Sequence, residues 1–224
     1  MFNKTLFLFD IDGTLIHINK AGKKAFNLAL ENTFGRPNLL DNFSLSGKSD
    51  LETFHKVLNK LNKKYKQKYW KKFINCFENI LNKESKNYTW NKIAGIENFL
   101  NYLINNNGKL ALITGNSQIG AAIKLKNCGL YKYFPVGGFG HENQSRKIIA
   151  KIALKKSNSY YNTDFKKIFA FGDTPDDIKA GRAINAQMIA VYQGGYSKSD
   201  LERYNPFLLI KNYRNIKKIF EKNI

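Results

Sequence analysis

The stretch LFLFDIDGTL, residues 6–15, places the strongest constraint on how this chain folds. An apolar run ends in two aspartates, Asp10 and Asp12, which stand one residue apart and lead into a glycine turn. A short apolar run without polar alternation is typical of a central parallel strand that is covered on both faces. In an open α/β sheet, ligands bind beyond the carboxyl ends of the strands. The two carboxylates are therefore predicted to face a binding site.

Alternation of apolar strands and helices along the chain predicts a doubly wound parallel sheet. We predict strands at residues 5–9, 109–113, 133–136, 167–171, 188–191 and 207–210. We predict helices at residues 20–34, 50–61, 65–81, 95–106, 119–126, 144–156 and 175–184, followed by a basic C-terminal helix. Residues 17–90 break the alternation because they are helical only. We interpret them as a small helical domain inserted into a Rossmann-like core that is formed by residues 1–16 and 91–224.

Composition indicates a globular protein rather than a nucleic-acid reader or a membrane-spanning protein. The chain has 224 residues, of which 43% are hydrophobic, and it has a net charge of +20. Lysines interleaved with asparagines along the whole chain indicate a solvated surface, and arginine, the usual residue for reading nucleic acids, is scarce. No apolar run approaches the roughly 18 residues that span a bilayer. With only two cysteines, we expect a reduced, cytoplasmic protein. We also expect it to be monomeric or homodimeric, without a specific nucleic-acid partner or membrane attachment.

Polar side chains follow two further predicted strands. Thr114, Gly115 and Asn116 come directly after the strand at 109–113, and Asp173 and Asp177 come after the strand at 167–171. Because parallel strands end at the same edge of a sheet, these groups are predicted to meet the aspartates of the first strand. Carboxylates this close raise one another's pKa, and a hard divalent cation such as Mg²⁺ relieves the repulsion. Asp176, in the first turn of a helix, fits a helix-capping role better.

The motifs, taken together, resemble the haloacid dehalogenase-like phosphohydrolase superfamily. They are DIDGTL at residues 10–15, a threonine at the end of the second strand, a basic residue that opens a later helix, and GDTPDD at residues 172–177. The resemblance covers the whole chain in the right order. The inserted helices and the form of the last motif look like the phosphoglycolate phosphatase-like branch, whose insert is a cap over the active site.

The resemblance implies roles for four aspartates. Asp10 would be the nucleophile that takes the phosphoryl group, and Asp12 would be the general acid and base. Asp173 would complete a Mg²⁺ site with Asp10 and the backbone carbonyl of Asp12, and Asp177 would support the metal ligands or their basic partner. Dehalogenases of this superfamily lack a carboxylate two residues after the nucleophile. Asp12 therefore favours phosphate-ester chemistry.

The resemblance also implies a set of phosphate-binding groups. Thr114 would hydrogen-bond the transferring phosphoryl group, with Gly115 and Asn116 beside it. Family members usually have a lysine at the start of the helix that precedes the last motif, and here the segment reads GFGHENQSRKIIAK. We assign Arg146 to this role, and Lys147 is the alternative.

In the inserted helices, the loop residue Lys48 could reach the site and contact the substrate, or be one more surface lysine. The sequence thus favours a Mg²⁺-dependent phosphatase that hydrolyses a small phosphorylated metabolite through a phospho-aspartate. Two alternatives remain open: a sugar phosphomutase on the same scaffold, and a basic nucleic-acid-binding protein without turnover.

Overall fold

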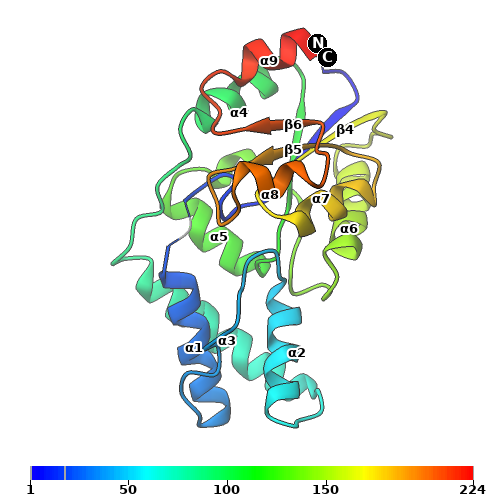
Figure 1. The fold of residues 1–224 in the computed structure, drawn as a ribbon. Helices are drawn as coiled ribbons and strands as arrows, with labels where there is room; N and C mark the ends of the chain where they lie inside the picture. Colours follow the sequence, from blue (N-terminus) through cyan, green and yellow to red (C-terminus); the bar gives the residue numbers. More distant parts are fainter. Residues whose placement is uncertain (1, 18, 224) are drawn as a thin grey trace.

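The computed structural model describes residues 2–17 and 19–223, and within them a parallel sheet carries helices on both faces (Figure 1). All strand pairings in this part of the chain are parallel, in the order β3-β2-β1-β4-β5-β6. The order reverses between β1 and β4, the switch point at which such sheets bind ligands. The strands are β1 (Thr5–Phe9), β2 (Lys109–Ile113), β3 (Gly137–Gly138), β4 (Lys167–Gly172), β5 (Gln187–Val191) and β6 (Leu208–Ile210).

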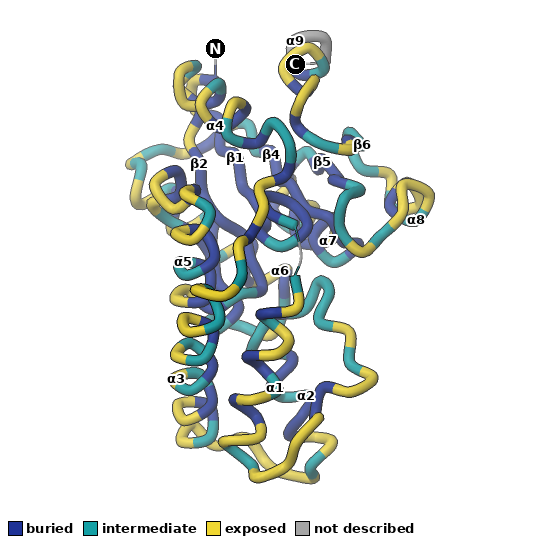
Figure 2. The backbone as a smooth tube through the Cα atoms, turned by 90° about the vertical axis from the view of Figure 1, so that its left-hand side faces the viewer, coloured by how far each residue is buried: buried dark blue, intermediate teal, exposed yellow. Residues whose placement is uncertain are grey.

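Strand β1 shows why the sheet is covered on both sides. All of its residues are buried, and its side chains alternate between two separate hydrophobic clusters. Phe7 and Phe9 stack on Phe169 and Phe171 of β4, with ring centroids 5.3 and 4.4 Å apart. This cluster is covered by α4 (Ile96–Asn105), α5 (Gln118–Asn127) and α9 (Ile216–Asn223), and the opposite one by α6 (Arg146–Tyr160), α7 (Pro175–Arg182) and α8 (Lys198–Glu202). Figure 2 shows the buried strands between these helices. The predicted doubly wound sheet is confirmed.

The inserted helices α1 (Ala21–Phe34), α2 (Asp50–Lys60) and α3 (Gln67–Glu84) lie together beyond the carboxyl ends of the strands (Figure 1). They share aromatic packing, in which Phe26 contacts Phe73 and Phe77 at centroid distances of 4.6 and 5.2 Å. We call α1–α3 and their connecting loops the helical module, and its extent over residues 17–90 stays a prediction. Among the described residues, no helix has both the length and the apolar character needed to cross a membrane.

Two elements differ from those predicted. The strand expected at 133–136 is replaced by the 3₁₀ turn η1 (Tyr131–Tyr133) and the two-residue strand β3. Pro135 has no N–H to give to a ladder, and pairing with β2 begins where Leu112 N donates to Val136 O at 3.0 Å. The short helix α8 was not predicted, although Ser197 and Asp200 form a capping box at its start.

The helical module is joined to the core through the loop before α2. The backbone N–H of Asp50 donates to Gly115 O at 2.8 Å, and the side chain of Asp50 accepts from Ser117 N at 2.7 Å. Glu78 of α3 accepts from the Ser117 hydroxyl at 2.9 Å. Burial raises the pKa of the Asp50 carboxyl to about 7, against the lowering effects of the Ser117 hydrogen bond and the charge of Lys124. The junction therefore contains a carboxyl whose charged form is disfavoured.

This junction predicts how stability depends on pH. From about pH 4 to pH 7, folded Asp50 keeps a proton that the unfolded chain has lost, so the free energy of unfolding falls as pH rises through this window. Asp50→Asn keeps an acceptor for Ser117 N and removes the titration. We expect the Tm of this variant to rise relative to wild type between pH 4 and 7 and to level off above pH 7, measured in EDTA. Asp164→Asn, at an exposed acid paired with Lys166, is the control. A Tm difference that is constant with pH would contradict the assignment.

Candidate active site

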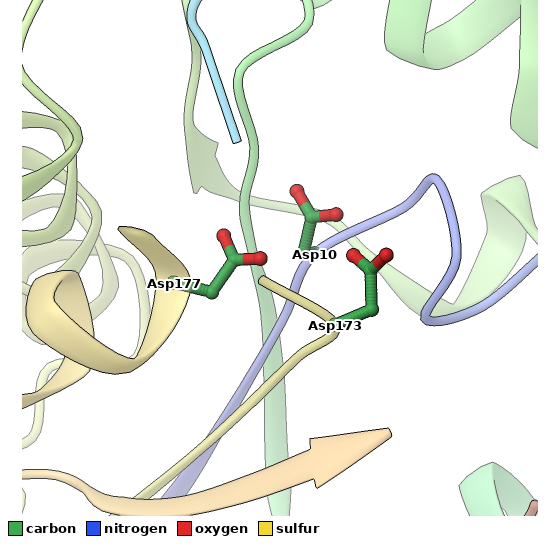
Figure 3. Close-up of side chains that lie close together, drawn as sticks. All are labelled: Asp10, Asp173 and Asp177. Atoms are coloured by element: carbon green, nitrogen blue, oxygen red, sulfur yellow. The ribbon is translucent and has the colours of Figure 1, made fainter. Parts of the chain in front are cut away.

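The ends of β1, β2 and β4 bring the predicted polar residues to one place. Asp10 follows β1, Thr114 follows β2 and Asp173 follows β4, and the backbone N–H of Asp10 donates to Phe171 O at 3.0 Å. Asp177 joins them from the first turn of α7. Figure 3 shows that the side chains of Asp10, Asp173 and Asp177 lie close together.

These three aspartates form a buried acidic cluster. One carboxylate oxygen from each lies within 4.8 Å of those of the other two, and all three residues are buried. Both oxygens of Asp173 are buried and have no hydrogen-bond partner among the described residues. A buried polar atom without a partner is costly, and carboxylate oxygens are ligands of hard divalent cations. The donor set therefore fits a divalent metal ion.

Two glycines shape the backbone around Asp173. A Cβ added at Gly13, which has a φ of 80°, would lie 2.2 Å from Oδ2 of Asp173, and one added at Gly194 would lie 1.8 Å from the same atom. At both positions a side chain would displace the Asp173 carboxyl group from its present place. The glycine of the DIDGTL motif thus serves this close approach as well as the turn.

Electrostatics inside the cluster favour protonated acids in the absence of a cation. Burial, followed by the charge of Asp177, raises the pKa of Asp10 to about 7, and the nearby Arg146 guanidinium limits the rise. Burial and the charges of Asp177 and Asp10 raise the pKa of Asp173 well above its ordinary value. Binding of a metal ion would release these protons, so its affinity should increase with pH.

Arg146 lies inside the site at the start of α6. Its Nη2 donates to Asp10 Oδ1 at 3.1 Å and to Ile113 O at 3.3 Å, and it also pairs with Asp177 Oδ1. Burial would lower the pKa of Arg146, but the charges of Asp177 and Asp10 outweigh it and raise the pKa above its ordinary value. Lys147 is exposed, so the structure places the first of the two predicted cations in the site and the second on the surface.

Asp177 has both oxygens engaged. While Oδ1 pairs with Arg146, Oδ2 accepts from the N–H and the hydroxyl of Thr174 at 3.1 and 2.6 Å, in a capping box at the start of α7. Asp177 therefore fixes Arg146 and the helix, whereas Asp173 keeps its oxygens free of protein donors among the described residues. Asp176 lies in the first turn of α7, where an acidic side chain was expected to serve the helix start, and it also accepts from Lys48 at 2.6 Å.

The segment after β2 serves two purposes. Thr114 is fully buried, and Asn116 Nδ2 donates both to Thr114 Oγ1 and to Asp12 Oδ2 at 2.9 Å. A Cβ at Gly115 would lie 2.2 Å from the backbone oxygen of Lys48, so the glycine allows the module loop to approach. Gly115 and Lys48, both predicted to bind phosphate, contact each other where the core meets the module, and both line the cavity described next.

The site opens into a cavity of about 480 Å³ between the core and the helical module. The core supplies polar groups, including Asp10, Asp12 and Asp173, and the module supplies Phe26 and Phe77 on the other side. The cavity can therefore hold a small molecule whose polar end meets the strand ends. Its lining also includes Asn116, Lys124, Arg146, Thr174, Asp177 and the module loop at residues 43–48.

One buried cation of the site was not predicted from the sequence. Lys124 of α5 is 6% exposed, and its Nζ lies 2.5 Å from Asp12 Oδ2. A signal was present: Lys124 stands three residues after Ala121 and seven after Ser117, on the stripe of α5 that is buried. A lysine on a buried stripe requires a partner, and Asp12 provides it.

Comparison with known proteins agrees with this arrangement. The family model described as haloacid dehalogenase-like hydrolase matches residues 7–191. A Clostridium perfringens protein named as a pyrophosphatase, PpaX, is 25% identical over 215 residues, which cover 96% of each chain.

Two solved structures illustrate the likeness of fold. A hydrolase from Pseudomonas syringae matches with a TM-score of 0.74 and 16% identity, over 97% of this chain and 98% of the other. A β-phosphoglucomutase from Clostridium difficile matches with a TM-score of 0.74 and 20% identity, over 97% and 96%. The family match spans most of the chain and includes β1 and β4, whose ends carry the acidic cluster. The chain therefore belongs to the haloacid dehalogenase-like hydrolase family.

Proposed function

We propose that this phosphohydrolase is a Mg²⁺-dependent phosphatase that hydrolyses a small phosphomonoester through a phospho-aspartate on Asp10. The observation that supports the proposal best is the position of Asp10, which lies in the acidic cluster and lines the same cavity as Asp12. An aspartate nucleophile divides one difficult hydrolysis into two displacements. A reduced, cytoplasmic location is also a proposal, supported by the free thiols of Cys76 and Cys128.

Mg²⁺, when bound, would be held by Asp10, Asp173 and the backbone carbonyl of Asp12, and would screen the repulsion between the phosphate and the nucleophile. Thr114 and Arg146 would hydrogen-bond the phosphoryl oxygens. Arg146 also orients the nucleophile, because the same guanidinium that faces the cavity donates to Asp10.

In the first displacement, an oxygen of Asp10 attacks phosphorus and the bond from phosphorus to the ester oxygen breaks. Asp12 gives its proton to that oxygen, so the product leaves as an alcohol. In the second displacement, Asp12 takes a proton from a water molecule that attacks phosphorus, and the bond to Asp10 breaks to release inorganic phosphate. Asp10 is thereby regenerated as a carboxylate, and Asp12 is again protonated.

The helical module would act as a cap. It covers the cavity with Phe26 and Phe77, and the start of α2 is hydrogen-bonded to the core at Gly115 and Gly140. A closed cap excludes bulk water, which strengthens the electrostatic interactions of the phosphate. The apolar lining of the module favours a substrate that carries a carbon skeleton next to its phosphate.

A phosphomutase is the second candidate. The structural match to a β-phosphoglucomutase shows that mutases share this fold. The two activities use the same nucleophile and differ in whether water or a sugar hydroxyl receives the phosphoryl group. Net release of inorganic phosphate from a monoester supports the hydrolase, and transfer between two positions of a sugar phosphate without such release supports the mutase.

The nucleophile assignment predicts a complete loss of turnover in Asp10→Asn, because a carboxamide does not attack phosphorus. Phosphate release from p-nitrophenyl phosphate with Mg²⁺ is the measurement, and wild type should lose this activity in EDTA. Asp164→Asn changes an exposed acid far from the cavity and should keep wild-type kinetics. Turnover by Asp10→Asn close to the wild-type rate would sink the proposal.

The position of Arg146 predicts a loss of both stability and phosphate binding in Arg146→Ala. Removal of the cation leaves Asp10 and Asp177 buried without their partner, a change that typically costs about 3–5 kcal/mol. Urea unfolding should show a decrease of this order, and KM for the phosphate ester should rise. Lys147→Ala, at the exposed neighbouring position, should change the free energy of unfolding by less than about 0.5 kcal/mol. The opposite pattern would transfer the role to Lys147.

A further inference from the structure

We propose that Lys124 is a positioning residue for Asp12, holding one of its carboxylate oxygens so that the other faces the ester oxygen of the substrate. This inference rests on the proposed phosphatase function. Lys124 lies outside the strand-end motifs, on α5, and nothing in the steps described above uses it. Its side chain is nonetheless almost completely buried and lines the cavity.

Lys124 and Asn116 form a hydrogen-bonded network around one oxygen of Asp12. The ammonium group donates to Asp12 Oδ2 at 2.5 Å and to Asn116 Oδ1 at 2.7 Å. Asn116 in turn donates to the same Asp12 Oδ2 at 2.9 Å. Oδ2 thus accepts two hydrogen bonds, whereas Oδ1 of Asp12 has none within the described part of the chain. These hydrogen bonds restrict rotation of the Asp12 carboxyl group about its Cβ–Cγ bond.

This arrangement decides which oxygen carries the proton. An oxygen that already accepts two N–H donors has no lone pair well placed for an additional proton, so a protonated Asp12 carries its hydrogen on Oδ1. Oδ1 is then the atom that gives the proton to the ester oxygen as the phosphorus–oxygen bond breaks. A reacting group that is held in one orientation avoids the entropic cost of finding it in the transition state.

The surroundings support a positioning role over a purely structural one. Asn116 links Lys124 to Thr114, whose hydroxyl it also contacts at 2.9 Å, so the lysine is connected to the proposed phosphate-binding threonine as well as to the acid. The residue of α1 next to Lys124 is a glycine: a Cβ added at Gly22 would lie 3.8 Å from Lys124 Nζ. The cap therefore presents no side chain there and leaves the lysine in contact with the cavity.

The leaving group of the substrate provides a selective test. p-Nitrophenolate is a stable anion that leaves with little help from an acid, whereas an alkoxide needs the proton of Asp12. Lys124→Met should therefore lower kcat/KM by about 100-fold for glycerol phosphate, within the range of general acid catalysis, and by about 10-fold or less for p-nitrophenyl phosphate. A merely structural lysine would lower both values equally.

A double-mutant cycle isolates the pairing with Asp12. In an Asp12→Ala background, Lys124→Met should cause no further loss with glycerol phosphate, because the residue that it positions is absent. Lys126→Met is the matched control, since Lys126 lies on the same helix and is exposed, with its ammonium group 4.9 Å from the centre of the Tyr131 ring. It should keep wild-type values with both substrates.

Lys124→Gln keeps an N–H donor and is used in the same way if the methionine variant does not fold. It should show the same selectivity between leaving groups with a smaller loss. Equal losses with both substrates, or additive losses in the double variant of an active enzyme, would overturn the role of Lys124 alone. Absence of phosphate release from both esters by wild type with Mg²⁺ would instead overturn the proposed function, and this role with it.

Discussion

Mutual repulsion among buried carboxylates is the constraint on which this structure depends. Asp10, Asp173 and Asp177 meet at the carboxyl edge of the sheet, and Asp12 faces the same cavity. Two buried cations pair with three of these four acids: Arg146 with Asp10 and Asp177, and Lys124 with Asp12. The remaining two negative charges correspond to the charge of one divalent ion. Without a bound cation, burial favours the protonated forms of Asp10 and Asp173.

The helical module depends on the same edge of the sheet. Its loop contacts the segment after β2, where the close approach of Lys48 and Gly115 requires glycine. The helical module thus attaches to the strand end that also carries Thr114. In the proposed function, closure of the module and phosphate binding would be linked through residues 114–116. The ion pair between Lys48 and Asp176 adds a second connection, from the module to the first turn of α7.

Patterns along the chain were sufficient to predict the sheet, because each buried parallel strand is a short apolar run, and three of these runs are followed directly by polar residues. They also located Asp10, Asp12 and Asp173, since a turn with carboxylates after an apolar run has few other uses. The pairing of β3 could not be predicted, because two glycines carry no strand signal and the preceding Pro135 delays pairing. Lys124 was missed for a different reason: its spacing on α5 indicates a buried position, but its partner Asp12 lies 112 residues away in the sequence, so no local pattern identifies the pair.

Asp10 and Asp12 are chemically identical and one residue apart, yet the fold gives them different surroundings. Asp10 exposes only 9% of its side chain and is held by an arginine that it shares with Asp177. Asp12 exposes 28% of its side chain and is held by Lys124 of α5 and by Asn116, which follows β2. Two identical groups acquire different roles when their environments differ in this way. In the proposed mechanism the nucleophile Asp10 has to stay in place and the acid Asp12 has to reach the leaving oxygen. The buried arginine that holds Asp10 and the greater exposure of Asp12 fit these two requirements.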